Sequence, residues 1–144
     1  MSGPVRQSIE IDATPEQVYD VIVDFERYPS FVPNQSGARI LHQDADRWEV
    51  EFELQIVKRL SYTLMLSGER GKSLRWQLVR GDMMKKNDGG WLLEALPDGR
   101  TKATYDIEVG MKGFVPKSIS TKLVGTTLPE NLKAFKREAE RRTS

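Results

Sequence analysis

The chain has 144 residues, of which 38% are hydrophobic and 30% charged, and its formal net charge is +1 at pH 7. These values predict one globular domain spanning residues 1–144, and no apolar run approaches the ~20 residues that a membrane-spanning helix needs. The small net charge argues against a chain-wide field that would attract DNA. Cysteine is absent and the N-terminus lacks an apolar leader, so we expect a cytoplasmic protein.

The first part of the chain predicts one strand followed by helices. Val5, Ile9 and Ile11 share one phase of a two-residue alternation, which is typical of a strand. Residues 14–17 read Thr-Pro-Glu-Gln, which supplies a helix N-cap, a proline at the first helical position and the glutamine of a capping box. Residues 25–33 carry two prolines among aromatic residues, so we expect a short and broken second helix there.

Six further strands are expected, because apolar and polar residues alternate through most of the central part of the chain. The clearest alternation begins at Trp48, with glutamates on the polar face. Residues 81–90 are interpreted as a polar connection that ends in a bulge at Gly89 and Gly90. The six predicted strands cover residues 38–43, 48–56, 60–67, 74–78, 91–95 and 103–111.

One long helix is predicted from Pro116 to Arg142, because apolar residues recur there at mostly three- to five-residue steps and mark one helix face. A kink or short break is expected between Gly125 and Pro129, since proline removes a backbone donor and crowds the preceding turn. A strand, two short helices, six strands and a long helix indicate an α+β protein. The long helix must cover the apolar face of the sheet.

This order of elements, together with two short segments, resembles a known superfamily. Residues 24–33 read Asp-Phe-Glu-Arg-Tyr-Pro-Ser-Phe-Val-Pro, and residues 128–133 read Leu-Pro-Glu-Asn-Leu-Lys. Both resemble the START-like helix-grip (SRPBCC) superfamily, in its polyketide cyclase/dehydrase and coenzyme Q-binding branch. The resemblance implies a curved seven-stranded antiparallel sheet wrapped around the C-terminal helix. It also implies a cavity for a hydrophobic small molecule, and a related branch is associated with ribosomes.

Large side chains on the inward phases of the sheet and helix are predicted to line that cavity. Tryptophan and tyrosine suit a flat or elongated apolar ligand, because their N–H and O–H groups can orient it. Plain core packing is the alternative, since any apolar sheet face has a similar composition. The predicted cavity residues are Phe52, Leu54, Tyr62, Leu64, Trp76, Trp91, Tyr105, Met111, Leu123, Leu128, Leu132 and Phe135.

Three loops that combine basic and apolar residues are expected at one edge of the sheet, because alternate turns of a meander lie at the same end. Such a rim fits transient contact with an anionic membrane surface during ligand exchange, so the protein would then be peripheral at the membrane. Ordinary surface loops are the alternative. The rim residues are Lys58, Arg59, Met83, Met84, Lys85, Lys86, Phe114 and Val115.

Reactive side chains are scarce in this sequence. His42 is the single histidine and there is no cysteine, so we expect neither a multi-histidine metal site nor a cofactor, and we interpret His42 as a surface or structural residue. No catalytic residue is predicted. If the protein were an enzyme, polyketide aromatase/cyclase chemistry would first implicate Tyr62, Tyr105 and Arg59.

The leading hypothesis is a protein that binds or transports a hydrophobic small molecule, such as a lipid, a quinone or a polyketide-like compound. A polyketide aromatase/cyclase and a ribosome-associated binding module are the alternatives. The basic residues near the C-terminus complement the helix dipole, and this role is sufficient to explain them. DNA is not an expected partner, and the sequence leaves the oligomeric state open.

Overall fold

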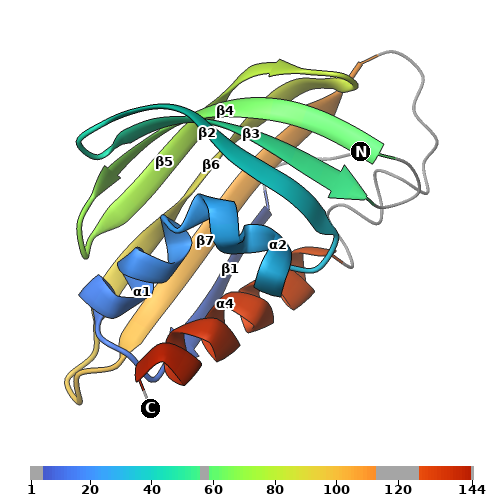
Figure 1. Cartoon of the computed structure of the whole chain (residues 1–144). Helices are drawn as coiled ribbons and strands as arrows, with labels where there is room; N and C mark the ends of the chain where they lie inside the picture. The colour runs from blue at the N-terminus through green and yellow to red at the C-terminus, as the bar shows by residue number, and fades with distance from the viewer. Residues whose placement is uncertain (1–4, 56–58, 113–126, 144) are drawn as a thin grey trace.

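The computed structural model describes residues 5–55, 59–112 and 127–143, and for residues 127 and 128 it describes the backbone only. Seven strands form one antiparallel sheet that curves over the described helices on its concave face (Figure 1). The predicted α+β class and helix-grip arrangement are therefore confirmed. The elements are β1 (Val5–Ile11), α1 (Pro15–Ile22), η1 (Phe25–Arg27), α2 (Tyr28–Phe31), β2 (Gln35–Asp44), β3 (Arg47–Gln55), β4 (Arg59–Glu69), β5 (Ser73–Gly81), β6 (Met84–Ala95), β7 (Thr101–Met111) and α4 (Thr127–Thr143).

The sheet has the strand order β1-β7-β6-β5-β4-β3-β2. Strands β2 to β7 form a meander, and β1 joins it by pairing with β7, where Val5 lies opposite Ile107. The predicted alternation is present in β3, where Trp48, Val50 and Phe52 are buried. This alternation places one face of each strand against the helices and the other in solvent, since successive side chains point to opposite faces of a sheet.

Helix α1 begins as its sequence predicts. Thr14 is the N-cap, its hydroxyl accepts a hydrogen bond from the Gln17 amide at 3.2 Å, and the Gln17 side chain accepts from the Thr14 amide at 2.8 Å. This capping box satisfies two amides at the helix start that lack a partner within the helix. The predicted broken helix is also present as η1 and α2, and the buried Phe25 ring packs edge-on against Trp48 at 5.3 Å.

The interpretation of residues 81–90 as a polar connection is wrong, because β6 already begins at Met84. Gly89 and Gly90 do not form a bulge, since both pair in regular register with β5 on one side and β7 on the other. The register shift of the β6–β7 pair lies earlier, between Met84 and Lys86. Glycine is required at these two positions because a Cβ atom on either would approach the carbonyl oxygen of a neighbouring strand to within 2.4 Å.

Helix α4 packs against β1, α1 and α2, and Leu132, Phe135 and Ala139 lie on its buried face. Pro129 occupies the first turn of α4, where the missing N–H removes no bond within the helix. The preceding part of the predicted long helix, with Leu123 and Gly125, lies outside the described residues.

Candidate functional site

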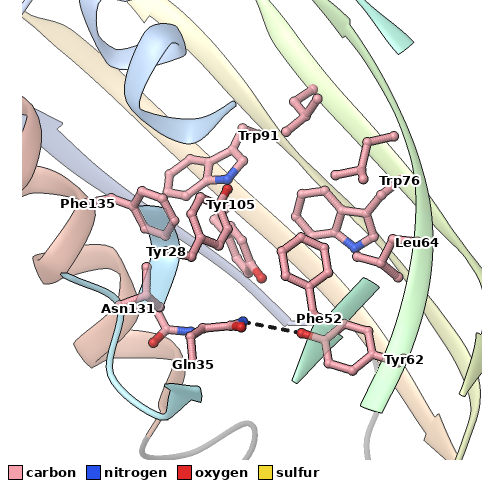
Figure 2. A pocket seen from close by; sticks show the side chains of 13 residues that line it. Tyr28, Gln35, Phe52, Tyr62, Leu64, Trp76, Trp91, Tyr105, Asn131 and Phe135 are labelled. Atoms are coloured by element: carbon pink, nitrogen blue, oxygen red, sulfur yellow. Dashed lines mark hydrogen bonds between the residues drawn. The ribbon is translucent and has the colours of Figure 1, made fainter. Parts of the chain in front are cut away.

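A cavity with a volume of about 70 Å³ lies between the concave face of the sheet, the α2 region and α4 (Figure 2). Eight residues of strands β3 to β7 form most of its wall, and the α2 region, the start of β2 and α4 complete it. The residues that line it are Tyr28, Val32, Gln35, Phe52, Tyr62, Leu64, Leu66, Leu74, Trp76, Trp91, Tyr105, Asn131 and Phe135.

Ring contacts hold the aromatic walls of the cavity in place. The Trp91 ring packs edge-on against the rings of Tyr105 and Phe135, with centroid-to-centroid distances of 4.9 Å and 5.2 Å. The contact with Phe135 joins the sheet to α4. On the opposite wall, Phe52 stacks on Tyr62 at 5.6 Å, because the two residues are paired across β3 and β4. Such aromatic pairs contribute about 0.5–1.5 kcal/mol each beyond their buried area. The walls are therefore preorganised.

The cavity is small in this conformation, because its volume of about 70 Å³ is below the ~300 Å³ at which ordinary ligand pockets begin. A ligand larger than a few water molecules must displace lining side chains when it enters. Leu64, Leu66 and Leu74 face the cavity and can change rotamer more readily than the interlocked rings.

One wall depends on a buried hydrogen bond between two neighbouring strands. The backbone ladder joining β5 to β6 covers only Ser73–Trp76 opposite Gly89–Leu92. Just beyond its end, the indole N–H of Trp76 donates to the side-chain oxygen of buried Asn87 at 3.0 Å. This bond fixes the orientation of the Trp76 ring and satisfies both groups, which a buried position requires.

Two other amide oxygens at the cavity lack a hydrogen-bond partner. The Gln35 amide nitrogen donates to the Tyr62 hydroxyl at 3.4 Å, but Oε1 of Gln35 and Oδ1 of Asn131 are both buried and unpaired within the described part of the chain. Figure 2 shows Gln35 lying between Asn131 and Tyr62, with a dashed line for its hydrogen bond to Tyr62. Each unpaired buried acceptor costs about 1–3 kcal/mol, so this end of the cavity is polar and energetically unfavourable when empty.

Burial keeps the tyrosines of the cavity protonated. Desolvation raises the pKa of Tyr62 to about 12, although the hydrogen bond from Gln35 opposes this. Desolvation also raises the pKa of Tyr105, with a further contribution from nearby Tyr62, and it raises the pKa of Tyr28 well above its ordinary value. At neutral pH these hydroxyls are therefore hydrogen-bond donors and not bases.

All four tyrosines of the chain have a raised pKa, because desolvation, with Asp46 as a second cause, also raises that of Tyr19 to about 12. An unfolded tyrosine ionises near pH 10, so the stabilisation is complete below that pH and is lost as the pH rises from about 10 through about 12. We therefore expect the ultraviolet absorbance of tyrosinate to stay low in the folded protein and to rise cooperatively with alkaline unfolding. A gradual rise that begins near pH 10 in the folded protein would contradict this.

The structure brings seven of the predicted cavity residues into the lining: Phe52, Tyr62, Leu64, Trp76, Trp91, Tyr105 and Phe135. Leu54 and Leu132 are buried and Met111 is half-buried, but none of the three lines the cavity. Leu123 and the Leu128 side chain lie outside the described residues.

Sequence reasoning missed six lining residues. Leu66 and Leu74 occupy the predicted inward phases of their strands and could have been included on that signal. Tyr28 and Val32 reach the cavity from the broken helix, and Gln35 and Asn131 are polar residues with no pattern that marks them. Their positions depend on how distant elements pack.

The predicted rim is only partly accessible. Met84 is 2% exposed and belongs to the core, and Met83 packs against the core, because β6 begins there; their assignment to an exposed rim is therefore wrong. Lys85 and Lys86 are exposed, and Lys86 pairs with Glu108 at 2.9 Å. Lys58, Phe114 and Val115 lie outside the described residues. Contact with an anionic membrane stays a prediction.

Arg59 does not join the two tyrosines that were considered with it for catalysis. Its guanidinium is exposed and lies 3.6 Å from the Glu53 carboxylate, away from the cavity lining. His42 is exposed on β2. In residues 5–55, 59–112 and 127–143, no group of three or more potential ligands could hold a metal ion, and no helix is long and apolar enough to cross a membrane.

Comparison with known proteins gives one family and several relatives. The family model described as polyketide cyclase/dehydrase and lipid transport matches residues 11–136. The ribosome association toxin RatA of Vibrio cholerae is 25% identical over 138 residues, which cover 94% of each chain.

Two solved structures share the fold. A START superfamily protein from Mycobacterium smegmatis has a TM-score of 0.83 and 24% identity, with 96% of this chain and 98% of that chain covered. The Zhui aromatase/cyclase from Streptomyces sp. R1128 has a TM-score of 0.85 and 15% identity, with 100% and 97% covered. At these identities both structures establish the fold and not the activity.

Proposed function

The chain belongs to the polyketide cyclase/dehydrase and lipid transport family, and from this membership we propose that it binds or transports a hydrophobic small molecule between its sheet and its C-terminal helix. The composition of the cavity carries the proposal: of the thirteen described residues that line it, seven are aromatic and none carries a formal charge at neutral pH. A concave, largely apolar lining with a few polar groups is typical of small-molecule sites.

Binding without a chemical step fits the ionisable groups of the lining. These are three tyrosines with a raised pKa, which can donate hydrogen bonds but cannot accept a proton from a substrate near neutral pH. A polyketide aromatase/cyclase is the enzymatic alternative. It requires that Tyr62→Phe or Tyr105→Phe lower turnover of a polyketide substrate while leaving its affinity measurable.

Filling the cavity is expected to abolish ligand binding. Leu66 is buried in the lining, whereas Leu92 is 43% exposed on the outer face of the sheet. We expect native mass spectrometry of the purified full chain to detect a bound apolar molecule, which Leu66→Trp loses and Leu92→Trp retains. Overpacking costs about 1–3 kcal/mol, so the thermal midpoint of each variant is measured as well. Leu64→Phe provides a smaller obstruction if Leu66→Trp fails to fold.

Equal ligand content in the filled variants and in Leu92→Trp would contradict binding in this cavity. Loss of the ligand from both tryptophan variants would also contradict it, because the outer-face substitution leaves the lining intact. We expect the amount of bound ligand to fall at least about tenfold in Leu66→Trp and Leu64→Phe and to stay unchanged in Leu92→Trp.

Ribosome association is a second candidate, because the RatA relative carries that name and covers most of the chain. The basic side chains of α4 provide little support for it, since their charges are largely neutralised by nearby carboxylates. Co-sedimentation with ribosomal particles at physiological ionic strength tests this candidate independently of any ligand. The ion pairs are Lys133–Glu130, Lys136–Glu140, Arg141–Glu138, Arg142–Glu138 and Arg142–Asp24.

A further inference from the structure

The charge of the lining limits what the cavity can hold. None of the thirteen described residues that line it is a lysine, an arginine or a histidine. A carboxylate or phosphate that entered would lose its water without gaining a cation, and such desolvation costs several kcal/mol per ion. The ligand head group must therefore be neutral.

The hydrogen-bonding groups at the polar end of the cavity limit the ligand further. Oε1 of Gln35 and Oδ1 of Asn131 are buried acceptors without a partner among the described residues, so they require a ligand that donates. A quinone, an ether or an ester offers only acceptors and would leave both oxygens unsatisfied. A hydroxyl group donates one hydrogen bond and accepts others.

The tyrosines supply the complementary donors. The Tyr62 hydroxyl accepts from Gln35, so its own proton remains to be donated. The Tyr105 hydroxyl forms no hydrogen bond to another described residue, and its raised pKa keeps its proton in place. A ligand hydroxyl at this end could thus donate to an amide oxygen and accept from a tyrosine at the same time.

From these three features we infer that the cavity selects a neutral ligand with an apolar body and a hydroxyl head group, such as a phenol or a hydroquinone, over the matching quinone, ether or carboxylate. This inference rests on the proposed binding function and names its ligand class. Gln35 and Asn131 would accept hydrogen bonds from the ligand head group, and the aromatic walls would pack against its apolar body.

Three ligands with the same apolar body and different head groups test the inference. Isothermal titration of the full chain at pH 7 compares 4-propylphenol, 4-propylanisole and 4-propylbenzoate, which end in a hydroxyl, a methyl ether and a carboxylate. We expect the phenol to bind at least about tenfold more tightly than the ether, and the benzoate to bind most weakly. Asn131→Leu and Gln35→Leu are each expected to reduce the phenol-to-ether ratio to about twofold or less.

The melting temperature of each variant shows whether a change in binding comes from loss of a specific contact or from general destabilisation of the fold. Asn131→Leu removes an unpaired buried oxygen with little change in shape, so its melting temperature should equal or exceed that of the parent. Val18→Ala is the control, because Val18 is buried on α1 but does not line the cavity; it should lower the melting temperature and leave the phenol-to-ether ratio unchanged. Val21→Ala, another buried position outside the lining, serves the same purpose if Val18→Ala does not fold.

The outcomes distinguish the two proposals. Equal affinity for phenol and ether, tighter binding of the benzoate, or a ratio that survives both Asn131→Leu and Gln35→Leu would overturn the head-group inference while leaving a hydrophobic binding site in place. Failure of all three ligands to bind the parent protein would contradict the proposed function itself.

Discussion

Phe135→Ala is expected to lower the free energy of unfolding by about 3–5 kcal/mol, the usual cost of deleting a buried aromatic ring. Phe135 is 5% exposed on α4, and its ring contacts Tyr28 at 5.2 Å, Phe31 at 5.4 Å and Trp91 at 5.2 Å. It therefore joins α4 to the α2 region and to the sheet simultaneously. Urea unfolding followed by tryptophan fluorescence measures the loss.

The same substitution should enlarge the cavity, because Phe135 is part of its lining. Apolar ligands are then expected to bind at least as tightly to Phe135→Ala as to the parent at temperatures where both are folded. Leu92→Ala is the control, since that side chain is 43% exposed and its removal should cost less than about 1 kcal/mol. A loss below about 1 kcal/mol for Phe135→Ala would show that α4 is not held through this ring.

Gly89→Ala is expected to destabilise the protein by about 3 kcal/mol, at the upper end of ordinary overpacking. A Cβ atom at this position would lie 2.3 Å from the Asp106 carbonyl oxygen and 2.9 Å from the Trp76 ring. The backbone cannot retreat, because Gly89 is paired with Trp76 on one side and Ile107 on the other. The thermal midpoint should fall, and the displaced Trp76 ring should weaken ligand binding.

Gly110→Ala is the matched control for this second substitution. The atoms nearest to its Cβ atom would belong to the Lys85 and Lys86 side chains, at 3.3 Å or more, and the Lys85 side chain can move away. We expect a change below about 1 kcal/mol. Similar thermal midpoints for the two alanine variants would refute the steric requirement for glycine at position 89.

Local patterns explain why much of the fold could be predicted from the sequence. The Thr14–Gln17 capping box and the alternation from Trp48 each lie within one short segment of the chain. Such a segment is enough to predict the helix start or the strand. The start of β6 was missed for a physical reason. Its inward position 87 is an asparagine, which interrupts the apolar alternation, and that polar group is tolerated because Trp76 pairs with it.

The cavity was less predictable than the sheet. Whether an inward side chain lines the space or lies beside it depends on packing between elements far apart in the chain, as the different positions of Leu64 and Leu54 illustrate. The polar end is formed by Gln35, the first residue of β2, and by Asn131 on α4. No periodicity connects these two residues, so only the folded chain reveals them.

Methyl-resolved NMR of leucine-labelled protein, titrated with propylbenzene, tests the central claim of ligand binding inside the cavity most directly. This ligand lacks a head group, so the result does not depend on the hydroxyl inference. We predict saturable shift changes at the methyl groups of Leu64, Leu66 and Leu74, with little change at exposed Leu41 and Leu92. Changes confined to Leu41 and Leu92, or no change up to the solubility limit of the ligand, would contradict a binding site between the sheet and α4.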